Sequence, residues 1–233
     1  MKIGIMQPYL FPYIGYFQLI NCVDKFVVHD DVQFIKGGWI NRNRILMGSR
    51  DYMFTFSIKS ASAYDKINQR EFSNSVEGDK KKFLRNIEYA YSKAPFYKEV
   101  FEVVESSINS KIGNVSNAII QSITYICKYL EINTEFIISS NINKDESLKG
   151  EQRVINICKK LNATQYINPI GGIELYSKEE FNKHGIVLNF LKTNKINYKQ
   201  FNNKFVQNLS IIDIMMFKPK DEIKTLLEEY QLI

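Results

Sequence analysis

The chain has 233 residues, of which 45% are hydrophobic and 24% are charged, as in an ordinary globular protein. Its formal net charge of +6 favours anionic partners, but many lysines lie along predicted helix faces, so charge alone does not indicate a nucleic-acid partner. The sequence contains no apolar run of about 18 residues, which excludes a membrane-spanning helix.

The length suits one sizeable core, and we expect a single domain over residues 1–233 with a helical insertion at about 77–131. The opening residues MKIGIMQP lack the long apolar segment and cleavage site of a signal peptide, so we expect a cytoplasmic protein. The three cysteines, Cys22, Cys127 and Cys158, are far apart and predict neither a disulfide nor a metal site. We also expect no tightly bound cofactor.

The first thirty residues predict the opening of a parallel α/β unit. Residues 2–6 form a short apolar run that ends at Gln7 and Pro8, as a buried strand does. Residues 13–22 place apolar side chains on one helical face, with Pro12 suited to the first turn. Residues 26–31 then predict a second buried strand that stops at two carboxylates. Strand, helix and strand in this order are typical of a Rossmann-like fold.

The rest of the chain continues the alternation around a helical block. Asp79 is placed to cap the first helix of that block. Ser177 and Glu180 form a capping box, and Gly185 ends the same helix. The elements predicted after residue 50 are strands at 51–59, 135–140, 165–169 and 186–191 and helices at 80–92, 96–109, 115–131, 151–162, 177–185, 208–217 and 219–230. We therefore expect an α/β fold with a Rossmann-like parallel sheet flanked by helices.

Ligands of open parallel sheets gather outside the carboxyl ends of the strands, where this sequence is unusually polar. The polar or flexible residues that follow predicted strands are Gln7, His29, Asp30, Asp31, Gln33, Asn168 and Gly172, with Tyr13 in the loop or first helical turn after the first strand. Together these residues predict a small-molecule pocket. His29 and Asp31 are the candidate catalytic residues, because a carboxylate neighbour orients an imidazole and raises its basicity.

Each of these residues also has a structural interpretation. Gln7 can satisfy backbone groups at a strand end, and Tyr13 can serve packing alone. A lone histidine such as His29 is often a hydrogen-bonded core residue. Asp31 can cap the turn that follows it, and the Gly171–Gly172 pair can be a plain turn. The sequence leaves these alternatives open.

Residues 36–44, KGGWINRNR, carry the strongest binding signal. Two glycines allow a sharp turn, after which a flat ring, two amides and two guanidinium groups follow. Arginine binds phosphate through two parallel hydrogen bonds, lysine binds it as a point charge, and tryptophan stacks on a base or a sugar. The residues predicted to bind substrate here are Lys36, Trp39, Asn41, Arg42 and Asn43. The alternative is a solvated surface loop anchored by the tryptophan.

The sequence lacks the motifs of several common enzyme classes. A glycine-rich dinucleotide fingerprint, a Walker A loop and a nucleophile elbow are absent from the sequence, which disfavours dinucleotide redox, P-loop and α/β-hydrolase chemistry. The chain has two histidines and no zinc-binding motif.

The segments IMQPYLFPYIGYFQLI, DKFVVHDDVQFIKGGWINRNRI, YINPIGGIELY and LSIIDIMMF resemble the WbqC-like protein family over essentially the whole chain. The matching positions are Gln7, Pro8, Gly15, Tyr16, Asp30, Asp31, Gln33, Lys36, Trp39, Asn41, Arg42, Asn43, Asn168, Gly172 and Asp213. His29 lies between matching blocks. The resemblance implies a role in surface-polysaccharide and O-antigen synthesis, by acyl or aminoacyl transfer to the amine of a nucleotide-linked dideoxyamino sugar.

Under this hypothesis the amine attacks an acyl thioester of coenzyme A or of an acyl carrier protein, and His29 or Asp31 removes the proton. An amide of Gln7, Asn41 or Asn43 would stabilise the oxyanion, while Lys36, Arg42 and Arg44 would hold the phosphates. Two other classes stay open. One is an ATP-dependent ligase or nucleotidyltransferase with Asp30 and Asp31 near magnesium, and the other is a non-catalytic module that binds a sugar nucleotide or carrier.

Overall fold

A computed structural model describes residues 1–109, 113–202 and 204–233. The main sheet has six strands in the order β5-β2-β1-β6-β7-β8, and only β8 runs antiparallel to its neighbour. Their bounds are β1 (Lys2–Met6), β2 (Lys25–Val28), β5 (Glu135–Ile138), β6 (Gln165–Pro169), β7 (Val187–Thr193) and β8 (Tyr230–Leu232). The predicted α/β fold with a mostly parallel sheet is confirmed.

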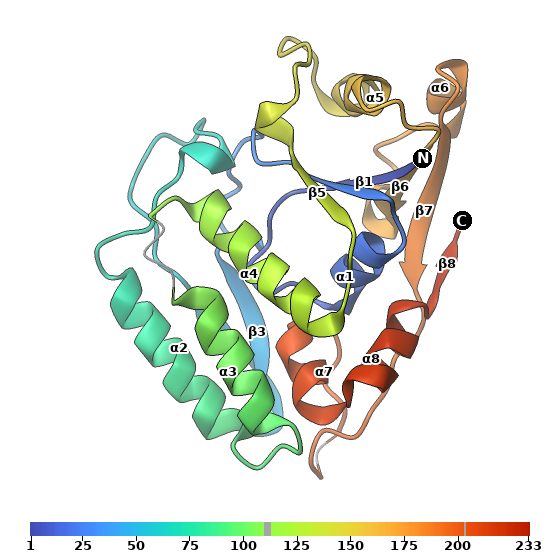
Figure 1. Ribbon diagram of the computed structural model, residues 1–233. Coiled ribbons are helices and arrows are strands. Elements are labelled where there is room, and N and C mark those ends of the chain that lie inside the picture. The colour runs from blue at the N-terminus through green and yellow to red at the C-terminus, as the bar shows by residue number, and fades with distance from the viewer. Residues whose placement is uncertain (110–112, 203) are drawn as a thin grey trace.

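Helices cover both faces of this sheet (Figure 1). On one face lie α5 (Gly150–Lys160) and α6 (Lys178–Lys183), and on the other lie α1 (Ile14–Asn21), α4 (Val115–Leu130) and α8 (Lys220–Leu227). Side chains of a strand alternate between faces. Accordingly, Ile3 and Val27 join the core under α5, whereas the neighbouring Phe26 and Val28 join the larger core under α1 and α4.

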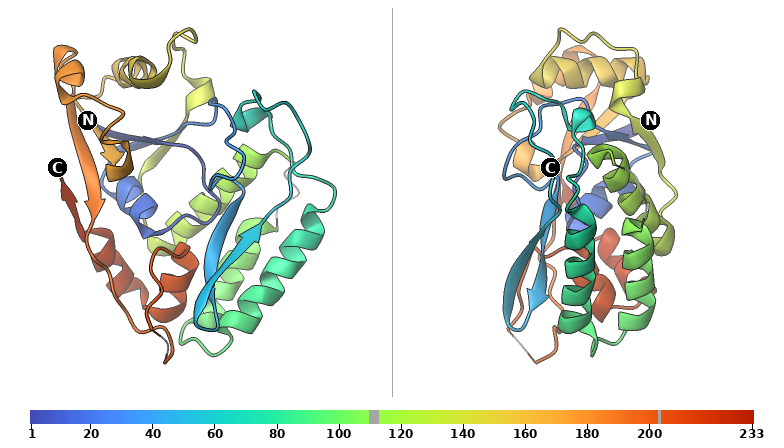
Figure 2. Two further views of the ribbon diagram at one scale, coloured as in Figure 1. Left: turned by 180° about the vertical axis from the view of Figure 1, so that it is seen from behind. Right: turned by 90° about the vertical axis from the view of Figure 1, so that its left-hand side faces the viewer.

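The predicted helical block is present in mid-chain as α2 (Val76–Tyr91), α3 (Tyr97–Ile108) and α4. The β3–β4 hairpin (Arg42–Met47 and Arg50–Thr55) packs beside this block, as Figure 2 shows from behind. Phe54 of the hairpin meets Phe83 of α2 with ring centroids 4.5 Å apart. The last helices, α7 (Ile211–Phe217) and α8, lie below the sheet in Figure 1.

Three local predictions were wrong. Residues 42–47 form β3, a strand that was not predicted, and its first three residues lie in the segment 36–44 that was interpreted as a loop. Asp79 does not cap α2, because the N-cap residue is Ser75 and the Asp79 carboxylate instead accepts a hydrogen bond from the backbone N–H of Ser57 at 2.8 Å. The last predicted helix stops at Leu227, and residues 230–232 instead form β8.

Candidate functional site

The strand order locates the place where ligands gather in such sheets. The chain moves from β1 outward to β2 and β5, and then returns to the other side of β1 to form β6 and β7. The order therefore reverses between β1 and β6, and the crevice at the carboxyl ends of these strands is the expected binding region. Gln7 follows β1, His29 follows β2, and Asn168 lies near the end of β6.

Asp31 is the centre of a group of charged side chains beside this edge. We call His29, Asp31, Lys144, Glu146 and Arg153 the ionic cluster. The Asp31 carboxylate lies 2.7 Å from Lys144 Nζ and 2.5 Å from Arg153 Nη2. Glu146 lies 3.4 Å from each of the same two cations. The two positive charges of Lys144 and Arg153 therefore balance the two negative charges of Asp31 and Glu146. This balance matters because Asp31, Lys144 and Arg153 are all buried.

His29 lies against this cluster, with Nε2 3.8 Å from Asp31 Oδ1. Neither of these two atoms has a hydrogen-bond partner among the described residues. Burial lowers the pKa of His29 to about 4, although the Asp31 carboxylate opposes that shift. Burial would raise the pKa of Asp31, but a hydrogen bond and charges from Lys144 and Arg153 outweigh it and lower the pKa to about 2. At neutral pH the site therefore pairs a neutral imidazole with a carboxylate.

Asp30 has a structural position beside the cluster. Its carboxylate accepts hydrogen bonds from the backbone N–H and the hydroxyl of Ser140 at 2.9 and 2.7 Å, and from Asn68 at 3.3 Å. These bonds join the carboxyl end of β2 to that of β5. Both carboxylate oxygens of Asp30 and Oδ2 of Asp31 are thus engaged by hydroxyl, amide, ammonium and guanidinium groups. Of these four oxygens, Asp31 Oδ1 alone is left without a hydrogen bond from the described residues, which gives a magnesium ion few free carboxylate ligands.

The structure divides the predicted binding segment between two grooves. The Arg42 groove has a volume of about 960 Å³. Its lining includes four of the predicted residues, Gln33, Lys36, Asn41 and Arg42, together with two further cations, Lys59 and Arg70. It adjoins the ionic cluster, because Gln33 forms a β-bridge with Lys66 and Lys66 Nζ lies 3.4 Å from Glu146.

The Trp39 groove lies at the start of α1 and has a volume of about 320 Å³. Its lining residues are Tyr9, Pro12, Tyr13, Trp39, Asn43, Arg44 and Asn208. The Arg44 guanidinium carbon lies 5.3 Å from the centre of the Trp39 ring. Trp39 and Tyr13 are 39% and 37% exposed, so both rings remain accessible to a ligand.

The two predicted amides of this segment make contacts within the fold. Asn41 Nδ2 donates to the Phe56 carbonyl at 2.8 Å. Asn43 Nδ2 donates to the carbonyls of Leu10 and Phe11 at 3.0 and 2.8 Å, and so fixes the loop that follows β1. Both asparagines are buried. They shape the grooves by positioning backbone, which leaves Gln7 as the predicted amide without a described side-chain hydrogen bond.

Asn168 and Gly172 form one packed unit at the end of β6. Asn168 Oδ1 accepts from the Tyr166 hydroxyl at 2.9 Å, and its Nδ2 donates to the Pro169 carbonyl at 3.1 Å. A Cβ atom at Gly172 would lie only 1.9 Å from Asn168 Nδ2. The glycine therefore lets the turn after β6 close over the Asn168 side chain.

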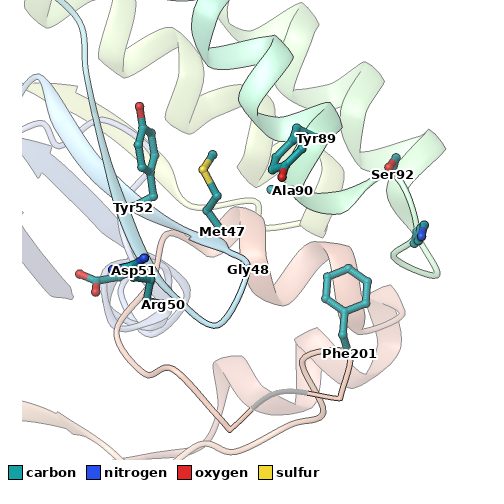
Figure 3. A pocket seen from close by; sticks show the side chains of 10 residues that line it. Met47, Gly48, Arg50, Asp51, Tyr52, Tyr89, Ala90, Ser92 and Phe201 are labelled. Atoms are coloured by element: carbon teal, nitrogen blue, oxygen red, sulfur yellow. The ribbon is translucent and has the colours of Figure 1, made fainter.

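A cavity larger than either groove lies elsewhere. It has a volume of about 1060 Å³ and lies between the tip of the β3–β4 hairpin and the end of α2, where Tyr52, Tyr89 and Phe201 line it (Figure 3). None of the predicted site residues borders it. We place the candidate site at the carboxyl edge of the sheet, because the ionic cluster and the switch in strand order lie there.

Sequence reasoning missed Lys144 and Arg153. Arg153 lies 122 positions from Asp31 along the chain, and the sequence alone does not bring such distant residues together. One signal was available, because Arg153 lies four positions before the buried Ile157 and so belongs to the apolar face of α5.

The fold and the site define an α/β protein with a polar, partly cationic candidate site at the switch point of a mostly parallel sheet. The chain belongs to the WbqC-like protein family, whose model matches residues 7–225. The resemblance inferred from the sequence is thereby confirmed.

A relative from Mycobacterium tuberculosis (strain ATCC 25618 / H37Rv), described as uncharacterized protein Rv1507c, is 26% identical over 219 residues, which are 92% of each chain. No solved structure matches the chain significantly. Within the described part of the chain, no helix is both long and apolar enough to cross a bilayer.

Proposed function

We propose that this protein is a transferase of surface-polysaccharide biosynthesis. It would move an acyl or aminoacyl group from a thioester, on coenzyme A or an acyl carrier protein, to the amine of a nucleotide-linked dideoxyamino sugar. The observation that carries the proposal is the neutral His29 beside the Asp31 carboxylate at the sheet edge. The resemblance to WbqC-like proteins implies the class of sugar substrate.

In the proposed step the sugar amine attacks the thioester carbonyl carbon. A C–N bond forms, the C–S bond breaks, and the amine proton passes through His29 to the departing thiolate. His29 is neutral at neutral pH and so has a lone pair to accept this proton, while its pKa of about 4 makes it a weaker base than an exposed histidine. Asp31 stabilises the imidazolium that forms, while its own contacts with Lys144 and Arg153 keep it from acting as the base. Gln7 is the amide available for the oxyanion.

The Arg42 groove is suited to the thioester donor. Its cationic residues match the phosphates of coenzyme A or of a carrier's phosphopantetheine. Arg70 is almost completely buried, stacks on the Phe34 ring with its guanidinium carbon 4.8 Å from the ring centre, and leaves Nε without a described partner. The contact between Lys66 and Glu146 links the groove to the ionic cluster.

The test offers a nucleotide-linked dideoxyamino sugar together with either an acyl thioester or free acid plus ATP, and reads the product by mass. We expect N-acylated product from the thioester without ATP. Strict dependence on ATP would instead indicate a ligase, and binding without turnover would indicate a non-catalytic module. Either result would overturn the proposal.

A further inference from the structure

The Trp39 groove continues into a second hollow, and Tyr13 is the one predicted site residue among the residues that line it. This second part has a volume of about 520 Å³ and shares Tyr13 and Asn208 with the first part. It follows the carboxyl ends of β6 and β7, where Ile170, Lys192, Thr193 and Lys195 line it. We call the two parts together the α1 groove.

The charged residues that line the α1 groove are all positive. Its charged lining residues are Arg44, Lys192 and Lys195, and neither Asp nor Glu lines either part. Arg44 is partly neutralised by Asp51 at 3.1 Å. Lys192 and Lys195 have no acidic partner in the described part of the chain. Unpaired cations in a concave surface attract an anionic ligand.

The start of α1 adds to this field. Pro12, Tyr13 and Ile14 line the groove, so the positive end of the helix dipole faces it. The N-cap residue, Tyr13, gives the helix no side-chain hydrogen bond, and the first turn of this fully described helix carries no acidic residue. An anion in the groove would supply the missing negative charge.

Tyr13 and Trp39 give the groove two aromatic surfaces. A Cβ atom at Gly15 would lie 2.5 Å from the Tyr13 ring, so the absence of a side chain there lets the ring lie against the helix. The Arg44 guanidinium lies over the Trp39 ring. Partly exposed rings next to cations and a helix terminus match a planar base joined to phosphates.

We propose that the α1 groove binds the nucleoside diphosphate part of the sugar nucleotide. This inference rests on the proposed function for the identity of the substrate. Lys192, Lys195 and the start of α1 hold the diphosphate, and Trp39 with Tyr13 holds the base. The Arg42 groove then stays free for the thioester donor, and the two substrates enter through separate grooves.

The single tryptophan makes the groove directly observable. The protein is titrated with UDP, dTDP, GDP and ADP, and Trp39 fluorescence is recorded. We expect a saturable change with at least one nucleoside diphosphate and a dissociation constant about tenfold lower than for the matching nucleoside, because the phosphates form charge-assisted hydrogen bonds. No saturable change with any of the four, or equal affinity for nucleoside and nucleoside diphosphate, would overturn the inference.

Variants localise the binding. Lys192→Ala combined with Lys195→Ala removes two exposed cations, and we expect about tenfold weaker binding of the diphosphate. Lys128→Ala, on the exposed side of α4, removes a charge elsewhere and should leave the affinity unchanged. Equal affinities in the double variant and the wild type would contradict the assignment.

Failure of this inference differs from failure of the proposed function. If the groove binds a nucleoside diphosphate but no acyl product forms, the transfer reaction is wrong and the binding site stands. If product forms but the double variant retains the wild-type KM for the sugar nucleotide, the reaction stands and the groove assignment is wrong.

Discussion

At the scale of single residues, Asp31 decides the electrostatics of the candidate site. Two cations reach its carboxylate from positions more than 100 residues away, and the Lys144 ammonium also donates to the Ser139 carbonyl. The sequence placed His29 and Asp31 side by side, and the structure shows them 3.8 Å apart. The sequence did not reveal the roles of Lys144 and Arg153, because a lysine or arginine normally indicates an exposed position.

The lowered pKa of His29 predicts a pH-dependent stability. The unfolded chain binds a proton on His29 near pH 6.5, whereas the folded protein binds it only near pH 4. Between these values the unfolded state holds more protons, so the free energy of unfolding falls as the pH falls through this window. His29→Gln should remove that part of the pH dependence. Urea unfolding at several pH values between 7 and 4 measures it.

His184 supplies the matched control. It is the other histidine of the chain and lies at the end of α6, 27% exposed, with Nε2 3.7 Å from Glu180. His184→Gln should retain the wild-type loss of stability on acidification. If His29→Gln and the wild type lose stability in parallel, His29 is not held neutral by burial.

At the scale of elements, apolar periodicity predicted the parallel strands and most helices because their buried faces are regular. It missed β3, since RNRILM begins with three polar residues whose contacts lie within the fold. It missed β8, since a strand of three residues directly after a helix has no period of its own. Asp79 was misjudged because its partner, the Ser57 amide, is distant in sequence.

Gly172 and Gly171 give a prediction about the turn after β6. Gly172→Ala would force the buried Asn168 side chain away from its hydrogen bond with Tyr166. We expect a loss of about 1–3 kcal/mol in the free energy of unfolding. Gly171→Ala meets no atom within 4 Å, so its effect should stay within about 0.5 kcal/mol. Similar urea midpoints for the two variants would show that the turn is not packed in this way.

At the scale of the whole molecule, one buried carboxylate joins the helical block and the hairpin to the C-terminal helices. Asp213 of α7 accepts hydrogen bonds from Tyr91 at 2.8 Å, from Tyr198 at 2.6 Å and from Gln200 at 2.6 Å. The Tyr91 hydroxyl also accepts from the backbone N–H of Leu46 in β3. The sequence marked Asp213 as part of a matching block but left open whether it was structural, and these contacts make it structural.

Tyr91→Phe tests this connection. The change leaves the buried Leu46 N–H without its partner and removes a donor from Asp213, so we expect a loss of about 2 kcal/mol in stability. Tyr89→Phe, two positions away on the same helix and 79% exposed, should be close to neutral. Equal thermal midpoints for the two variants would contradict a structural role for this network.

The kinetics of His29→Gln test most directly whether His29 accepts the amine proton in the proposed transfer reaction. We expect a kcat about 100-fold or more below the wild type, with KM for the sugar nucleotide little changed, because the α1 groove is intact. Folding is verified by circular dichroism, and His184→Gln serves as the control. A kcat for His29→Gln within about threefold of the wild type would show that His29 is not the base.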